Sequence, residues 1–304
     1  MAGKRLTRET ERDFPQKASS FHHVLSTPVF YRLGFFVANR IPLGILYSLA
    51  DLVGDASFFR YEEKREILRQ NLVRVFPDMP AREVHSLARR VFRNYARYLT
   101  DYGRFRGMST EKLDRTIPEI EGMEHARGAL HSPKGTILVT GHIGNWELGA
   151  LYFARMGLKV NVVVLPDSAP QIDAIRENYR SRYSIRTIAM DGSPFTALEI
   201  MTALRRGEMV AMLVDRSGAA EGVEGEFFGK PHFFPRGPFL LSRATGAMIL
   251  PAFIVRDGNG YRGLAEHPFV AEGQGDEPYV RRLAESLERI IRRYPDQWYN
   301  FLPI

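Results

Sequence analysis

The chain has 304 residues, enough to bury the core of one large domain or of two smaller ones. It contains no cysteine, which excludes disulfides, thiolate metal sites and a cysteine nucleophile. The net charge of +7 belongs to the N-terminal third: residues 1–106 hold 19 Lys and Arg against 11 Asp and Glu, whereas the remainder holds 23 against 24. A basic region of this kind suits an anionic membrane, an acidic partner or nucleic acid, unless its charges simply form a solvated surface.

The N-terminal part is expected to be helical and to contact a membrane. Residues 1–26 are expected to form a flexible tail, of which residues 1–16 are charged and lack the apolar core of a secretion signal. Residues 28–51 are the most apolar stretch, but Arg32, Arg40 and Pro42 interrupt it, and its longest uncharged piece falls short of the ~20 residues of a spanning helix. Its aromatic residues and arginines favour a monotopic interfacial segment, with a buried helical pair as the alternative. Apolar spacing predicts further helices over residues 61–76 and 81–102, so residues 27–110 form the expected membrane-associating region.

From residue 135 onward, strands and helices alternate. Strands are predicted at residues 136–140, 160–165, 185–188, 209–214, 248–255 and 261–265, and helices at residues 145–156, 170–183, 194–206, 237–245 and 278–294. This order predicts an α/β fold with a mostly parallel sheet flanked by helices. Residues 111–304 are the expected α/β core, forming one continuous domain with residues 27–110.

The most informative segment is the turn after the first of these strands. His142 follows the strand, Asn145 can cap the next helix, and Glu147 lies in the first turn of that helix. Strand ends of parallel sheets expose reactive groups, and a histidine beside a carboxylate is the usual make-up of a general base. We therefore interpret His142 as a base and Glu147 as its partner. A turn histidine followed by a helix-start carboxylate is the structural alternative.

The segment Gly141-His142-Ile143-Gly144-Asn145-Trp146-Glu147 resembles the His-x4-Glu/Asp motif of the lysophospholipid acyltransferase superfamily, in particular its bacterial lipid A biosynthesis branch of lauroyl and myristoyl transferases. Further matching blocks extend the resemblance from about residue 30 to residue 298. They include Arg180 and Arg182, Leu213-Val214-Asp215-Arg216, Phe227-Phe228-Gly229-Lys230-Pro231 and Pro295-Asp296-Gln297-Trp298.

The resemblance implies a glycerol-phosphate-acyltransferase-like fold and an O-acyltransferase. Such an enzyme moves a fatty acyl chain from an acyl carrier protein (acyl-ACP) or coenzyme A (acyl-CoA) thioester to a hydroxyl of a membrane glycolipid, here first of all a lipid A precursor. His142 would be the general base and Glu147 its partner, supported by Gly144, Asn145 and Trp146. The resemblance implies no bound cofactor, no metal and no nucleic acid. It implies acyl carrier protein as a partner and a peripheral or monotopic position on the cytoplasmic face of the inner membrane.

Several charged residues are candidates for substrate binding. Arg180 and Arg182 can match a phosphate bidentately, with a solvated helix end as the alternative. Arg236 precedes a helix start that suits an anion, and Arg236 and Lys230 are further candidate phosphate binders. Asp215 should face the same sheet edge as His142, positioning Arg216, Arg180 or the acceptor, unless it is a plain turn carboxylate. The phenylalanine-rich residues 226–237 could wall an acyl tunnel or pack as an ordinary loop.

Rival chemistries lack their motifs. The sequence has no Gly-x-Ser-x-Gly elbow, no paired histidines of a zinc protease and no phosphate-binding glycine loop. The ending after Trp298 lacks the Trp-x-His-Arg-Arg sequence of many lipid A acyltransferases, so a lysophospholipid, an ornithine lipid or an aryl-polyene lipid are alternative acceptors. A non-catalytic basic membrane-binding protein on the same scaffold is the alternative of another class. An apolar tunnel at His142 would favour the enzyme.

Overall fold

The computed structural model describes residues 40–105, 109–117, 120–165, 170–190, 192–217, 222–258 and 260–304. The predicted tail over residues 1–26 and the first part of the predicted membrane-associating region, up to residue 39, lie outside these described residues.

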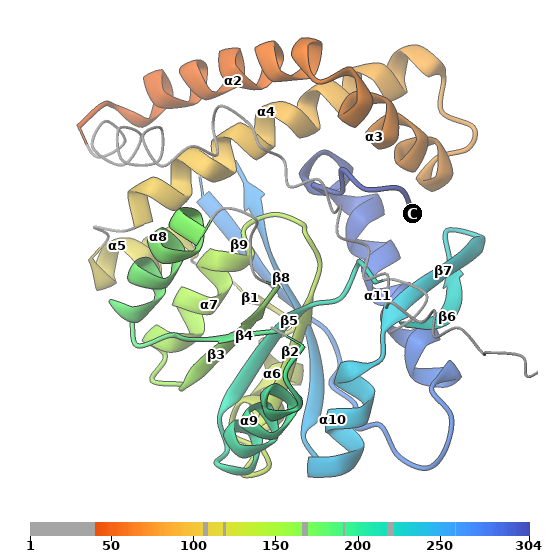
Figure 1. The fold of residues 1–304 in the computed structure, drawn as a ribbon. Helices are drawn as coiled ribbons and strands as arrows, with labels where there is room; N and C mark the ends of the chain where they lie inside the picture. The colour runs from red at the N-terminus through yellow and green to blue at the C-terminus, as the bar shows by residue number, and fades with distance from the viewer. Residues whose placement is uncertain are drawn as a thin grey trace, which may run out of the picture.

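Seven strands form one sheet in the order β1-β9-β8-β2-β5-β3-β4 (Figure 1). The strands are β1 (Ile120–Glu121), β2 (Thr136–Thr140), β3 (Val160–Val164), β4 (Arg186–Ala189), β5 (Met209–Leu213), β8 (Met248–Asp257) and β9 (Gly260–Ala265). Neighbouring strands pair in parallel except for β8 and β9, which are antiparallel. The predicted α/β class with a mostly parallel sheet is therefore confirmed, although the short β1 was not predicted.

Helices cover both faces of the sheet because its central strands are apolar on both sides. All five residues of β2 are buried; Leu138 packs into one cluster, whereas Ile137 and Val139 pack into the other. Helices α6 (Met123–Leu130), α7 (Trp146–Arg155) and α8 (Pro170–Ser181) lie on the Leu138 side. Helices α9 (Pro194–Arg205), α10 (Gly237–Thr245) and α11 (Glu277–Arg293) lie on the other side. The chain also contains the short α5 (Thr110–Thr116) and the 3-10 helix η2 (Pro295–Gln297).

The phenylalanine-rich segment folds as a hairpin, which the sequence did not predict. Strands β6 (Gly222–Phe227) and β7 (Lys230–Pro235) pair antiparallel around a turn in which Phe228 and Gly229 both have positive φ, the conformation of a tight two-residue hairpin. Phe227 and Phe234 are fully buried in the same cluster as α11. The structure thus favours the packed alternative for this segment.

Three helices lie across the end of the sheet at which β2 and β5 finish (Figure 1). They are α2 (Leu43–Arg60), α3 (Glu62–Val75) and α4 (Ala81–Phe105). Close packing of α2 on α4 requires Gly54, because a Cβ there would lie 2.6 Å from the Cα of Arg93. Arg89 and Arg93 of α4 both form ion pairs with Asp55 of α2, and these contacts link the two helices.

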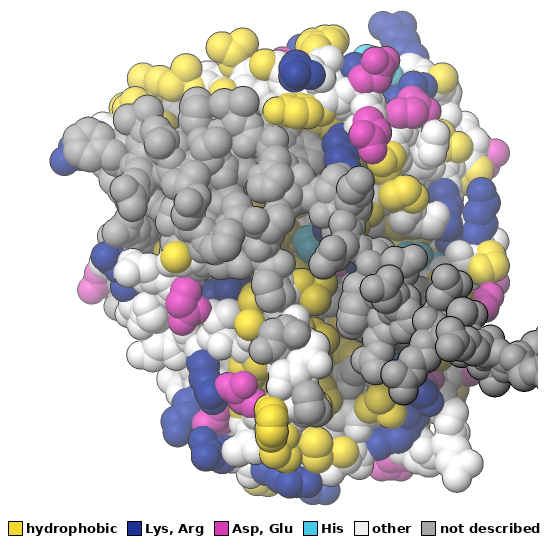
Figure 2. Space-filling model, in the orientation of Figure 1, with side chains coloured by type: hydrophobic (Ala, Val, Ile, Leu, Met, Phe, Trp, Pro, Cys, Tyr) yellow, Lys and Arg dark blue, Asp and Glu magenta, His cyan; other side chains and the backbone are white. Residues whose placement is uncertain are grey.

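The outward face of α2 is apolar. Ile45, Leu49, Leu52 and Phe59 are 47–66% exposed and follow one another at helical spacing. Figure 2 shows hydrophobic side chains along the upper edge of the molecule, where α2 lies. Among the described residues, no helix combines the length and the hydropathy needed to cross a bilayer.

Candidate active site

The turn after β2 brings His142 to the end of the sheet and holds it rigidly. Gly144 has a φ of +62°, and a Cβ at this position would lie 2.0 Å from the carbonyl oxygen of Ile254, so only glycine fits. The Asn145 side chain accepts a hydrogen bond from the Leu148 N–H at 3.0 Å, which caps α7 as expected. The motif glycine and asparagine thus fix the backbone on the C-terminal side of His142.

Asp215, and not Glu147, is the carboxylate beside His142. The Nδ1 of His142 lies 2.7 Å from Oδ1 of Asp215, and the His142 main-chain N–H donates to Oδ2 at 3.0 Å. The two residues meet because β2 and β5 are parallel neighbours, with Thr140 paired to Leu213. The Asp215 hydrogen bond fixes Nδ1 as the protonated nitrogen, so the lone pair of His142 is on Nε2. The His142 side chain keeps 20% of its surface exposed.

Electrostatics prepare this pair for proton transfer. Burial lowers the pKa of His142, and the positive charge of Arg216 lowers it further, while Asp215 acts in the opposite direction. Burial alone would raise the pKa of Asp215, but the charge and hydrogen bonds of His142, together with Arg216, hold it well below its usual range. Near neutral pH, the site therefore combines a neutral imidazole with an ionised carboxylate.

Glu147 forms an ion pair with Arg180 and not the predicted pair with His142. The Arg180 guanidinium donates to both carboxylate oxygens of Glu147, at 2.5 and 3.2 Å, and each side chain is only 6% exposed. Burial would lower the pKa of Arg180, but Glu147 raises it. The pair ties the start of α7 to the end of α8. Arg180, predicted to bind phosphate, is thus engaged inside the protein.

The other predicted binding residues are spread over the molecule. Arg216 lies beside the His142–Asp215 pair, where its guanidinium donates to Oδ1 of Asn300 and to the Tyr299 carbonyl at 3.0 and 2.7 Å. Arg182 is exposed just after α8, and Lys230 is exposed where β7 begins. Arg236 precedes α10 and forms an ion pair with the buried Asp276 at 2.5 Å. The six residues predicted to bind substrate or phosphate therefore do not form one anion site. They are Arg180, Arg182, Asp215, Arg216, Lys230 and Arg236.

The C-terminal segment completes the site, a role that the sequence did not reveal. Trp298 Nε1 donates to Oδ2 of Asp215 at 3.1 Å. Its main chain also pairs with the turn that carries His142, because Tyr299 N–H donates to the His142 carbonyl at 2.7 Å and Gly144 N–H donates to the Gln297 carbonyl at 2.9 Å. Residues 295–298 carried part of the family resemblance, which was the one available signal for this contact.

Aromatic side chains form one wall of the site. The Trp146 ring meets the His142 ring edge-on, with centroids 5.4 Å apart, and Tyr98 of α4 stacks on Trp146 at 4.7 Å. Arg176 of α8 also acts on this region, since its positive charge lowers the pKa of His142. The sequence singled out neither Tyr98 nor Arg176, because their helices pack here only in the folded chain.

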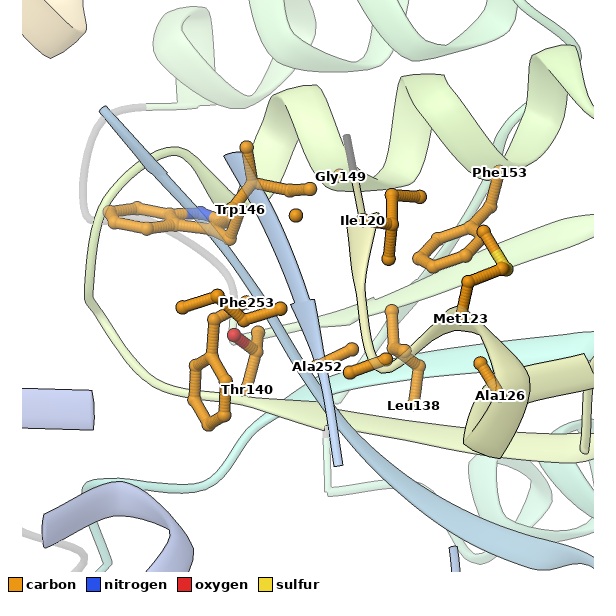
Figure 3. Close-up of a pocket in the computed structure, with 14 residues that line it drawn as sticks. Ile120, Met123, Ala126, Leu138, Thr140, Trp146, Gly149, Phe153, Ala252 and Phe253 are labelled. Carbon is orange, nitrogen blue, oxygen red and sulfur yellow. The ribbon is translucent and has the colours of Figure 1, made fainter. Parts of the chain in front are cut away.

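A narrow apolar pocket begins at this aromatic wall (Figure 3). Thr140 and Trp146 lie at one end, and Met123, Ala126 and Phe153 lie at the other, between the sheet and the helices α6 and α7. Trp146 therefore belongs to the pocket and also contacts His142. Within the described residues, no cluster of His, Asp or Glu has the geometry to hold a metal ion.

A histidine–carboxylate pair at the edge of a mostly parallel sheet, next to an apolar pocket, is the set of groups that general-base catalysis on an apolar substrate requires. The chain belongs to the family described as bacterial lipid A biosynthesis acyltransferase, whose model matches residues 15–303, and it is an acyltransferase of that family. The family resemblance seen in the sequence is thereby confirmed.

Two named relatives of the chain are acyltransferases. The chain is 28% identical over 90% of its length to the phosphatidylinositol mannoside acyltransferase of Mycobacterium tuberculosis, of which it covers 86%. It is 26% identical over 85% of its length to the lipid A biosynthesis lauroyltransferase of Escherichia coli, of which it covers 84%. The crystal structure of the 1-acyl-sn-glycerophosphate acyltransferase from Thermotoga maritima matches with a TM-score of 0.39 and 13% identity, over 85% of this chain and 100% of that one.

Proposed function

We propose that the protein transfers a fatty acyl chain from a thioester to a hydroxyl of a membrane glycolipid, with His142 as general base and Asp215 as its partner. The observation that carries the proposal is the 2.7 Å contact between Nδ1 of His142 and the buried Asp215 carboxylate. It leaves Nε2 free of a proton and therefore able to accept one from a hydroxyl.

The reaction needs only these two side chains for its proton transfers. Nε2 of His142 removes the proton of the acceptor hydroxyl while the oxygen attacks the thioester carbonyl. The tetrahedral intermediate collapses, the carbon–sulfur bond breaks, and the thiolate leaves and takes the proton back from Nε2. Asp215 stabilises the imidazolium that exists between the two steps. Glu147 acts in this scheme as a structural residue that holds Arg180 and, through it, α8.

The apolar pocket is the proposed site of the acyl chain. Its residues from Trp146 to Met123 and Phe153 offer a hydrocarbon surface (Figure 3). The Trp146 ring in turn contacts the His142 ring. Burying a chain there removes apolar surface from water, at about 25 cal/mol per Å². The thioester carbonyl would then lie at the Trp146 end, within reach of the attacking oxygen.

The donor is an acyl-ACP or an acyl-CoA, and we favour acyl carrier protein. An acidic carrier suits the excess of Lys and Arg in residues 1–106. Exposed Arg82 and Arg90 of α4 are two of the cations available to it.

For the acceptor, two glycolipids follow from the names of the relatives: a lipid A precursor and a phosphatidylinositol mannoside. A lysophospholipid, an ornithine lipid or an aryl-polyene lipid would keep the same chemistry. We further propose that the enzyme works as a peripheral protein on the inner leaflet of the inner membrane. The exposed apolar side chains of α2 support this position.

A direct assay tests the proposal. The purified full chain is given palmitoyl-CoA or palmitoyl-ACP together with a lipid A precursor or a phosphatidylinositol mannoside, and the acylated lipid is measured by mass spectrometry. We expect transfer to one acceptor and its loss in His142→Ala. Transfer to neither acceptor would redirect the search to the other lipids, whereas activity retained in His142→Ala would contradict the mechanism.

A further inference from the structure

A buried ionic cluster joins the helical region to the sheet. The Asp101 carboxylate of α4 is almost fully buried and accepts hydrogen bonds from the hydroxyls of Tyr47 and Tyr261, at 2.8 and 2.5 Å. The Arg256 guanidinium donates to the same carboxylate at 2.5 Å and to the Tyr47 hydroxyl at 2.7 Å. Tyr47 belongs to α2, Arg256 to β8 and Tyr261 to β9, so the cluster ties two helices to two strands.

The cluster reaches the turn of His142 through Tyr261. The Asn145 side chain is fully buried, and its Nδ2 donates a hydrogen bond to the Tyr261 hydroxyl at 3.3 Å. Its Oδ1 accepts from the Leu148 N–H and so caps α7. One amide therefore joins the start of α7 to strand β9. A buried amide N–H costs free energy when it lacks a partner, so the Tyr261 hydroxyl meets a requirement of this turn.

Asp101 sets the direction of the Tyr261 hydroxyl. A tyrosine hydroxyl has one proton to donate, and here that proton goes to Asp101. The oxygen lone pairs are then available to the Asn145 amide. Burial raises the pKa of Tyr261 well above its usual range, and the negative charge of Asp101 raises it further, so the hydroxyl keeps its proton.

Other contacts hold the strand and the turn together without this hydroxyl. The Arg256 main chain and the Gln297 side chain exchange two hydrogen bonds, at 2.7 and 2.9 Å. The Gln297 carbonyl in turn accepts from the Gly144 N–H at 2.9 Å. Loss of the Tyr261 hydroxyl should therefore leave this frame in place and remove only the partner of the Asn145 amide.

We propose that Tyr261 is a positioning residue for acyl transfer, which holds the Asn145 side chain and thereby the turn that carries His142. This inference rests on the proposed function of the His142–Asp215 pair. It gives the ionic cluster around Asp101 a role in aligning the base.

Two matched substitutions separate positioning from stability. Tyr261→Phe and Tyr47→Phe each remove a hydroxyl that donates to Asp101, whereas the Tyr261 hydroxyl also bonds the Asn145 amide. The purified variants are assayed for kcat and KM with palmitoyl-CoA and the glycolipid that the wild type accepts, and urea unfolding gives their stability. The pKa of the His142 imidazole is measured in parallel by NMR, with His142→Gln to assign its signal.

We expect Tyr261→Phe to lower kcat about tenfold, the effect of one lost hydrogen bond, and to leave KM within about twofold. The pKa of His142 should fall, because a displaced turn weakens the contact with Asp215 that stabilises the imidazolium. Tyr47→Phe should lose a similar amount of stability, yet keep kcat within about twofold of the wild type and leave the His142 titration unchanged.

A third substitution reaches the same hydrogen bond from its other end. Asn145→Ser keeps a side-chain cap for α7 and removes the amide donor. It should lower kcat about as much as Tyr261→Phe, and the double variant should be no worse than either single variant. If Tyr261→Phe fails to fold, the kcat of Asn145→Ser decides the matter: a loss of about tenfold supports the inference and a wild-type value contradicts it.

Wild-type kcat in Tyr261→Phe, equal losses of kcat in the two tyrosine variants, or additive losses in the double variant would overturn the inference while His142→Ala remains inactive. An active His142→Ala enzyme would contradict the proposed function instead. The NMR titration of His142 would then still report whether Tyr261 holds the turn.

Discussion

Asp215 and His142 lie 73 residues apart in the sequence and share two contacts, one from the imidazole Nδ1 at 2.7 Å and one from the main-chain N–H at 3.0 Å. The second contact binds the carboxylate to the main chain of His142 itself. The orientation of the ring and the position of the carboxylate are thus coupled. Glu147, five residues from His142, faces Arg180 instead.

The pH dependence of the reaction should reflect the lowered pKa of His142. The base acts when neutral, so kcat/KM should stay high as the pH falls and should decline only below the ordinary imidazole value of about 6.5. Arg216→Gln should shift that decline to higher pH, because it removes a positive charge that disfavours the imidazolium. A pH profile of kcat/KM for both proteins measures this. A decline above the ordinary imidazole value in the wild type would contradict the expectation.

Glu147→Gln should mainly affect stability. It leaves the Arg180 charge buried without its partner, which typically costs about 3–5 kcal/mol. Urea unfolding should show this loss, and the double variant with Arg180→Met should recover part of it. A protein of wild-type stability that has lost its activity would instead restore Glu147 as a catalytic residue.

The pocket should set the acyl chain length. Ala126→Leu fills its far end and should shift the preference toward shorter chains, whereas Phe153→Ala should shift it toward longer ones. Ala129→Leu is the matched control: Ala129 is a buried alanine of α6 that does not line the pocket, so overpacking there should cost a similar ~1–3 kcal/mol. Competition among saturated acyl-CoA donors of increasing length gives the preference. An equal shift in Ala126→Leu and Ala129→Leu would argue against the assignment.

The apolar face of α2 should dock on membranes. Leu52→Asp replaces a side chain that would enter the lipid interface, and the loss of about 2 kcal/mol of burial corresponds to roughly thirtyfold weaker binding. Sedimentation with phosphatidylglycerol vesicles measures the partition. Leu240→Asp is the control, because Leu240 is 48% exposed on α10, at the opposite end of the molecule from α2 in Figure 1. Equal loss in the two variants would exclude α2 as the specific surface.

The fold was largely predictable because its signals are local. The strand at residues 136–140 and the helix at residues 237–245 match the structure residue for residue, since apolar runs and the flanking glycines and prolines mark both. The hairpin was missed because its turn is formed by Phe228 and Gly229 without a standard turn pair, and its strands are rich in proline and glycine.

The site was only partly predictable because its partners are distant in the sequence. His142 and the capping Asn145 could be found from neighbouring residues. The choice between Glu147 and Asp215 depends on which strands lie side by side, and the placement of β5 next to β2 decides it. The contact of Trp298 with Asp215 likewise arises only when the C-terminal segment packs behind the sheet edge.

The roles of Asp215 and Glu147 are separated most directly by the rate constant of acyl transfer in Asp215→Asn and Glu147→Gln. It is measured in a single-turnover assay with palmitoyl-CoA and the accepted glycolipid and corrected for the folded fraction. We expect Asp215→Asn to lower this rate constant by about 10³–10⁴, as when a histidine base loses its orienting carboxylate. Folded Glu147→Gln should keep most of its activity. The reverse order, with Asp215→Asn active and folded Glu147→Gln inactive, would contradict the assignment of Asp215 as the partner of His142.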